Sequence, residues 1–506
     1  MRLESTLKST LIILLINILN IIVNFLTRKL FIDNIGIVFL GISSVFTNIL
    51  TLLSLSELGI HSAITFQLYR PIKENKLGQV KYLVKLFDAF YKKVAVAVLA
   101  LGLVILLILP VIIHDAELST SIIRFYFLIQ LSTTLASYLF ASRRTLLFVY
   151  QKQYLAAVYD AIINIIFTIL RIISIVIYKN FTMYLVVNGL QILSSNLFIY
   201  YKTRKHFPFL HDNSVRLEPF SVNIRKNLIN TSLSSVANFI YSSTDNIVIS
   251  IFIGIKSVGF LSNYKLIPYI IIEILTNIFK PVQASIGDLV HEHDSKATQI
   301  ETFEMYSYIR FLFAHFVSIM CLVLMDPFIE LWFGKQYLMS PIIVVLIVVD
   351  LYLFIYQGSL NDFIQTYGLF KDDRKLMIRG AIINLVTSLL LVRLVGIEGV
   401  LIGTIITQVY YWIARTSLVH SKAFSITKRK YLLRSVVFFA ISIISSILLY
   451  SLISRFYQTG FLFFLFASTV SGILTVSTAL VFTSKSKDFK ILKQTYLPII
   501  LKSIHR

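Results

Sequence analysis

The sequence predicts an all-α integral membrane protein with about fourteen transmembrane helices. Composition, the length of the apolar runs and the placement of basic residues lead to this expectation. Of the 506 residues, 57% are hydrophobic and 14% are charged, whereas soluble globular domains carry about 25% charged residues. We therefore expect lipid to surround most of the chain.

The apolar runs have the length of membrane-spanning helices, since about 20 residues cross a hydrocarbon core of about 30 Å. No small-residue cleavage site follows the first run, so we expect a retained helix there and not a signal peptide. The expected spans are 9–27, 35–56, 94–113, 122–142, 154–178, 181–200, 227–254, 257–280, 306–325, 341–363, 376–394, 396–418, 432–454 and 460–483.

The net charge of +22 follows the topology of these spans. With a cytoplasmic N-terminus, most lysines and arginines of the connections and tails fall on the cytoplasmic side. Seven fall on the other side, namely Arg28, Lys29, Lys179, Lys256, Lys335, Arg393 and Arg455. This asymmetry is the positive-inside pattern, with both termini in the cytoplasm. It explains the basic balance without a nucleic-acid partner. In 68–93, apolar residues at helical spacing further predict an amphipathic helix lying in the membrane interface.

An internal repeat is indicated when the chain is shifted by 221 residues without gaps. Asn17 then meets Asn238, and Phe31-Ile32 meets Phe252-Ile253. A shift of six helices keeps the direction of crossing, so the sequence predicts two parallel six-helix bundles, an arrangement found in transporters. The expected parts are an N-terminal bundle at 1–205, a cytoplasmic linker at 206–226, a C-terminal bundle at 227–420, and two further helices with a basic cytoplasmic tail at 421–506.

Polar side chains follow one face of two predicted helices. On the first helix they are Asn17, Asn20, Asn24 and Arg28, and on the seventh they are Asn238, Tyr241 and Asp245. Polar groups are costly in hydrocarbon unless they are paired, so these faces should look into the protein or a wet cavity. Either they bind a substrate there, or the asparagines only join helices together.

Ionisable residues also fall inside the predicted spans, where they mark functional sites or ion pairs. Asp245 and Lys265 lie at similar depth on two consecutive helices, either as a neutralising pair or as binding groups. We expect Arg28, Arg171, Lys265 and Lys280 to offer positive charge to an anionic substrate. Asp245, Glu273 and Glu57 are the candidates for a coupling cation.

Several kinds of catalytic or metal site are not expected. The chain has one cysteine, Cys321, and no glycine-rich phosphate loop, which argues against a disulfide framework, a four-cysteine metal site and ATP hydrolysis. The segment HEHD at 291–294 does not place its ligands on one helical face, and His315 reads as a core histidine. No catalytic residue, cofactor or metal is predicted.

Three segments resemble bacterial polysaccharide flippases of the MOP superfamily, the Wzx-like translocases of lipid-linked oligosaccharides. STDNIVISIFIGIKSVGFLSNYKLIPYIIIEILTNIFKPVQASIGDLV (243–290) resembles their seventh and eighth helices. GLFKDDRKLMIRGAIINLVTSLLLVRLVGIEGVLIGTIITQ (368–408) resembles helices 11 and 12, and LSLSELGIHSAI (53–64) resembles the end of the second. The resemblance implies a MATE-like fold that alternates between inward- and outward-open states around a cationic cavity.

The resemblance also implies a cargo. This would be an oligosaccharide on undecaprenyl pyrophosphate, moved across a bacterial plasma membrane for surface polysaccharide synthesis, with H⁺ or Na⁺ as the coupling ion and a polymerase and glycosyltransferases as partners. Two alternatives stay open. One is MATE-type multidrug efflux. Efflux of organic cations would favour an acidic cavity, whereas here the basic residues in or near the helices, Arg310 included, outnumber the plausible buried acids. The other is a membrane polysaccharide polymerase or ligase, although no long external loop is expected.

Overall fold

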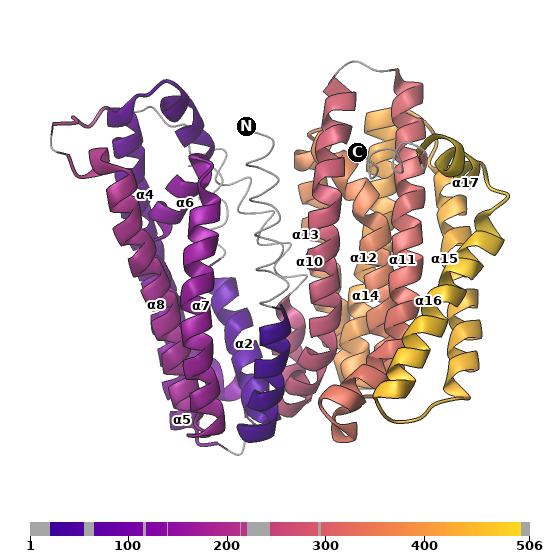
Figure 1. The fold of residues 1–506 in the computed structure, drawn as a ribbon, viewed down its shortest axis with the longest axis horizontal. Helices are drawn as coiled ribbons and strands as arrows, with labels where there is room; N and C mark the ends of the chain where they lie inside the picture. The colour runs from indigo at the N-terminus through magenta and orange to yellow at the C-terminus, as the bar shows by residue number, and fades with distance from the viewer. Residues whose placement is uncertain are drawn as a thin grey trace. The chain divides into compact units, whose positions relative to one another are not determined.

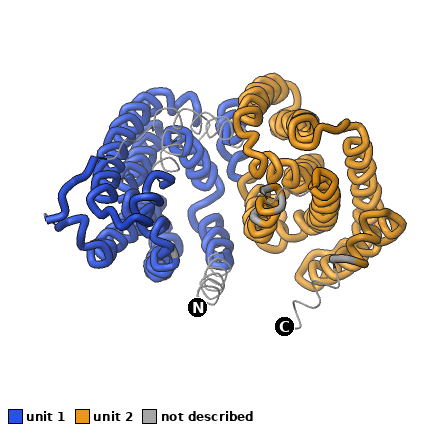
Figure 2. Tube along the Cα trace, turned by 90° about the horizontal axis from the view of Figure 1, so that it is seen from above, with its two compact units in different colours: residues 1–259 blue, residues 260–506 orange. Residues whose placement is uncertain are grey.

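The computed structural model describes residues 21–54, 65–114, 118–138, 140–212, 214–219, 243–291 and 295–496. All regular secondary structure in these residues is helical (Figure 1). The chain forms two compact units, unit 1 at Met1–Gly259 and unit 2 at Phe260–Arg506 (Figure 2). Each unit is described by itself below.

Unit 1 contains a set of long apolar helices and several short ones. Unlabelled helical stretches lie at 21–34, 65–73 and 243–252. The labelled elements are α2 (Ile37–Leu53), α4 (Leu77–Ile112), α5 (Thr120–Tyr138), α6 (Ala141–Val149), α7 (Gln153–Val176), α8 (Phe181–His206) and the short 3₁₀ helix η1 (Pro208–Leu210).

Unit 2 begins inside a long helix, α10 (Ile255–His291), whose first turn belongs to unit 1. Its other elements are α11 (Lys296–Trp332), η2 (Lys335–Tyr337), α12 (Pro341–Thr366), α13 (Phe370–Val395), α14 (Ile397–Leu418), the π-helical turn η3 (Val419–Phe424), α15 (Arg429–Ser454), α16 (Phe461–Thr483), α17 (Lys487–Ile491) and η4 (Leu492–Tyr496).

The helices confirm the predicted fold class. In the described part of the chain, ten helices are long and apolar enough to cross a membrane, or eleven if α5 and α6, bent by 44°, form one span. Helix α2 is apolar but shorter, at 17 residues. The described portion of each of the fourteen predicted runs is helical except for a few residues near its ends, because backbone groups in lipid must pair within their own segment.

The segment 68–93 differs from its prediction. Its second part is the start of α4, continuous with the following span, and the apolar face of that part is buried: Val80, Val84, Phe87 and Tyr91 are at most 3% exposed. Phe87 stacks edge-on against Tyr91, and Tyr91 lies 5.9 Å from the Tyr138 ring of α5. The prediction of a separate interfacial helix is therefore wrong, since the protein itself covers this face.

Two helical hairpins in unit 1 have matching turns. Gly36 and Gly254 adopt φ values of 109° and 128°, a region open chiefly to glycine. The N–H of Gly36 donates to the carbonyl of Phe31 at 3.2 Å, and that of Gly254 donates to Ile249 at 2.9 Å. Both pairs of equivalent positions are 218 residues apart.

The two hairpins also pack through reciprocal contacts. A Cβ on Gly41 would lie 2.2 Å from the carbonyl oxygen of Ile255, and a Cβ on Gly259 would lie 2.4 Å from that of Ile37. These residues are also 218 apart, so the turns follow a local two-fold relation. The predicted register of 221 is wrong here by three residues, because a shift of almost one helical turn keeps similar residues on the same face.

Candidate functional site

A cluster of polar side chains joins α7 to α8 inside unit 1. The Nη2 atom of Arg171 donates to Oδ1 of Asn164 at 2.9 Å and to the hydroxyl of Thr168 at 2.7 Å. The same Asn164 oxygen accepts a hydrogen bond from Nε2 of Gln191 on α8 at 2.9 Å. Since these spacings of four and three residues return to one helical face, α7 presents a continuous polar stripe to its neighbour.

The cluster also includes Tyr184 and a second arginine, Arg28. This tyrosine lies on α8, seven residues before Gln191, and its hydroxyl is close enough to Arg171 and Arg28 for direct electrostatic interaction with both. Its ring contacts Phe31 at 4.9 Å between centroids. Arg28 and Arg171, two of the predicted basic residues, thus both lie within electrostatic range of one hydroxyl group. We call Arg28, Asn164, Thr168, Arg171, Tyr184 and Gln191 the arginine cluster.

The charge of Arg171 is not neutralised within the described residues. Its hydrogen-bond partners there are an amide and a hydroxyl group, and its Nε is buried without a partner. The Oε1 of Gln191 is likewise buried and unsatisfied. A buried guanidinium normally has a carboxylate or another anion beside it. The cluster is therefore suited to bind an anion, for which arginine provides a planar fork of donors.

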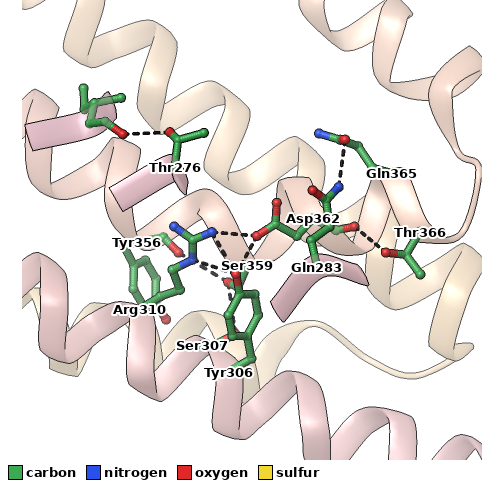
Figure 3. Close-up of polar contacts among 11 residues, drawn as sticks. Thr276, Gln283, Tyr306, Ser307, Arg310, Tyr356, Ser359, Asp362, Gln365 and Thr366 are labelled. Carbon is green, nitrogen blue, oxygen red and sulfur yellow. Dashed lines mark hydrogen bonds and ion pairs between the residues drawn. The ribbon is translucent and has the colours of Figure 1, made fainter. Parts of the chain in front are cut away.

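In unit 2, by contrast, the buried arginine is neutralised (Figure 3). Nη2 of Arg310 on α11 lies 2.6 Å from Oδ2 of Asp362 on α12, and Tyr306 donates to the same oxygen at 2.6 Å. The guanidinium also stacks on the Phe279 ring at 3.6 Å. Gly358 leaves room for it, since a Cβ there would be 2.5 Å from the guanidinium carbon. Arg310 does lie in a helix, as counted from the sequence, but Asp362 offsets its charge.

Other ion pairs join neighbouring helices within each unit. Arg144 of α6 forms a two-pronged pair with Asp160 of α7, at 2.7 and 2.9 Å. Arg415 of α14 pairs with Asp373 of α13 at 2.8 Å. These two ion pairs therefore join α6 to α7 and α13 to α14.

His315 has the core role that the sequence indicated. Nδ1 forms a hydrogen bond with Ser442 at 2.9 Å, and Nε2 forms one with Thr478 at 3.3 Å. The ring is fully buried.

The remaining predicted site residues are distributed over both units. In unit 1, Asn24 is exposed and Asp245 is 4% exposed. In unit 2, Lys265 is half-buried, while Glu273 and Lys280 are exposed on α10. Five predicted site residues lie outside the described residues: Asn17, Asn20, Glu57, Asn238 and Tyr241.

Four residues of the arginine cluster were not among the site residues predicted from the sequence: Asn164, Thr168, Tyr184 and Gln191. A signal existed for part of it, because Asp160, Asn164, Thr168 and Arg171 follow each other at helical spacing on α7, as the polar residues of the first helix do. No comparable stripe marks Tyr184 and Gln191. Their role depends on α8 packing against α7.

Solved structures of membrane transporters share this fold. A lipid II flippase, MurJ, in an inward closed conformation matches with a TM-score of 0.66 and 14% identity, over 93% of this chain and 98% of the other. A multidrug resistance MATE family transporter of the MOP superfamily matches in its inward-facing conformation with a TM-score of 0.62 and 15% identity, over 80% and 95%. An outward-facing conformation of such a transporter matches with a TM-score of 0.54 and 16% identity, over 81% and 95%.

No protein-family model matches the sequence, and neither does any curated protein. The structural matches define the class: the chain has the MATE-like fold of MOP-superfamily transporters. This confirms the fold that the resemblance implied, across nearly the whole chain.

Proposed function

We propose that this protein is a flippase that moves oligosaccharides linked to undecaprenyl pyrophosphate across a bacterial plasma membrane. The cargo would serve the synthesis of a capsule, an exopolysaccharide or a related surface glycan. The shared fold with a lipid II flippase supports transport of a lipid-linked substrate, and the sequence resemblance to Wzx-like translocases supports the polysaccharide precursor as cargo.

The observation that carries this proposal is the half-buried charge of Arg171, whose partners in the described residues are neutral. A pyrophosphate crosses hydrocarbon only if its charge is compensated, because transfer of an ion out of water is very costly. Arginine binds phosphate oxygens with two parallel hydrogen bonds. In this mechanism Arg171 and Arg28 hold the pyrophosphate, Lys265 and Lys280 add positive charge along its path, and polar side chains contact the sugars. Those side chains are Asn17, Asn20, Asn24, Asn238 and Tyr241.

Movement of the cargo would follow alternating access. A MATE transporter with this fold is known in inward-facing and outward-facing conformations. The lipid tail would stay in the bilayer while the headgroup passes through the protein, so no covalent chemistry is required and the protein would not be an enzyme. A proton or Na⁺ bound at Asp245, Glu273 or Glu57 would couple transport to an ion gradient. We expect both termini in the cytoplasm, and we expect a polysaccharide polymerase and glycosyltransferases of the same pathway as partners.

Multidrug efflux is the main competing function, since MATE transporters share the fold. An organic cation needs acidic or aromatic groups in its path, whereas the arginine cluster is positively charged. A polymerase or ligase is the weaker alternative, because such an enzyme needs catalytic groups on a sizeable external segment.

Reconstitution in proteoliposomes tests the proposal. Wild-type protein should move undecaprenyl-pyrophosphate oligosaccharide between leaflets, and Arg171→Gln should slow this movement. Arg379→Gln is the matched control, because it removes an exposed arginine of α13. Failure to move any such substrate, together with robust transport of a cationic dye, would overturn the proposal in favour of efflux.

A further inference from the structure

A second basic cluster lies at the other end of the unit 1 helices, where α4, α6, α8 and η1 meet. Arg143 of α6 is 9% exposed, and its guanidinium lies over the Tyr200 ring of α8 at 5.1 Å. Its Nη1 is buried and has no hydrogen-bond partner in the described residues. A nearly buried cation with an unsatisfied donor is costly unless an anion completes the site.

Three other basic residues surround this position. Lys81 of α4 is 6% exposed and donates to the carbonyl oxygens of Asp212 and Val215, at 2.5 and 3.1 Å. His211, just after η1, is 6.4 Å from the Tyr200 ring and within electrostatic range of Arg143, Arg204 and Lys81. The four positive or protonatable groups therefore act on one small region.

In the part of the chain that the structure describes, the carboxylate of Asp212, next to His211, forms no ion pair with these residues. Asp212 accepts a hydrogen bond from the backbone N–H of Ser214 at 2.8 Å, and it feels Lys81 at longer range. Among the ion pairs of the described residues, none involves Arg143 or Lys81. The direct contacts of Lys81 that the structure describes are with two carbonyl oxygens, and the guanidinium of Arg143 lies over a tyrosine ring.

We propose that Arg143, Lys81, Arg204 and His211 form a phosphoryl-binding site, separate from the arginine cluster. A phosphate group fits the chemistry, because its oxygens accept from the guanidinium fork, the ammonium and the imidazole at once. The charge pattern of the sequence places this end of the helices in the cytoplasm. The phosphoryl group would come either from an anionic phospholipid headgroup or from a free phosphate in solution.

Binding to the purified full-length protein tests the site. Inorganic phosphate is titrated into detergent-solubilised protein at constant ionic strength, with calorimetry as the readout. In a second arm, native mass spectrometry counts the lipids retained from nanodiscs of phosphatidylcholine with or without phosphatidylglycerol. Saturable binding in the first arm identifies free phosphate, and selective retention of phosphatidylglycerol in the second identifies a headgroup.

Three variants decide the outcome. Arg143→Gln should weaken the binding by about tenfold or more, as expected for a lost charge-assisted hydrogen bond. Lys205→Gln, an exposed basic residue in the last turn of α8, should leave it unchanged. His211→Gln alters an exposed side chain and should weaken binding even if Arg143→Gln fails to fold. Three results would overturn the proposal. One is equal binding by wild type and His211→Gln, and the second is equal binding by wild type and a folded Arg143→Gln. The third is the absence of saturable binding in either arm.

Discussion

Nη2 of Arg310 lies 2.6 Å from Oδ2 of Asp362, and this pair joins α11 to α12 within unit 2. The two side chains are 9% and 11% exposed, so water does little to screen them. Tyr306 shares the same carboxylate oxygen. The pair therefore behaves as one buried unit, and removal of either charge leaves the other uncompensated.

Asp362→Asn should lower the free energy of unfolding by about 3 to 5 kcal/mol, the usual cost of breaking a buried ion pair from one side. The measurement is thermal unfolding of the purified protein in detergent. Asp372→Asn is the matched control, since its pair with Lys422 is exposed at 51% and 32% and should be worth less than about 1 kcal/mol. Equal small losses of unfolding free energy in both variants would show that the buried pair stabilises the protein no more than the exposed pair.

Gly41→Ala should destabilise unit 1, because a Cβ at this position would lie 2.2 Å from a backbone carbonyl oxygen that cannot turn away. We expect a loss of about 1 to 3 kcal/mol, typical of an overpacked contact, and a similar loss for Gly259→Ala. Gly472→Ala on α16 meets no atom within 4 Å and should be neutral or slightly stabilising. The measurement is the melting temperature of each variant. If all three variants melted at the wild-type temperature, the close packing of these hairpins would be contradicted.

Arg171→Lys should retain part of the flippase activity that Arg171→Gln loses. Lysine keeps the positive charge but not the planar fork that binds two phosphate oxygens. Initial translocation rates in proteoliposomes should follow the order wild type, lysine, glutamine, with the glutamine variant reduced by about tenfold or more. If lysine and glutamine were equally active, the charge of this residue would not serve the cargo.

Asp245→Asn should uncouple transport from the ion gradient more strongly than Glu273→Gln. Asp245 is 4% exposed, whereas Glu273 is exposed to solvent, and a buried carboxylate gains more from a bound cation. The measurement is the rate of translocation with and without a proton or Na⁺ gradient. An Asp245→Asn protein that still responds to the gradient would remove this residue from the coupling site.

His211, in the second basic cluster with Arg143, Lys81 and Arg204, should make stability depend on pH. Partial burial and the charges of Arg143, Arg204 and Lys81 lower the pKa of His211, while Asp212 next to it is bonded to Ser214. The unfolded chain, with a histidine pKa of about 6.5, then binds the proton more readily than the folded one. Stability should therefore fall as the pH drops through about 6.5 towards the lower folded value.

His211→Gln should remove this part of the pH dependence. The quantity to compare is the melting temperature at pH 7.5 and pH 5 in wild type and variant, with His206→Gln, an exposed histidine at the end of α8, as the control. A variant with the same slope as wild type would contradict the lowered pKa.

The helices could be predicted from the sequence because membrane insertion depends on local composition. An apolar run of about 20 residues must pair its own backbone in lipid wherever it sits in the fold. The polar stripe on α7 was also readable, since Asn164, Thr168 and Arg171 share a face through helical spacing alone. Their grouping with Tyr184 and Gln191 could not be predicted from the sequence, because it requires α8 to pack beside α7.

The sequence by itself thus determined the fold class, the positions of the spans and the presence of charged residues within them at Arg171, Asp245 and Arg310. Tertiary structure alone decided which charges are neutralised: Asp362 cancels Arg310, while Arg171 has neutral neighbours in the described chain. It also decided the repeat register, through the reciprocal contacts of Gly41 and Gly259. The physical reason is one of range, since hydrophobicity acts residue by residue, whereas an ion pair or a close backbone contact exists only where two helices meet.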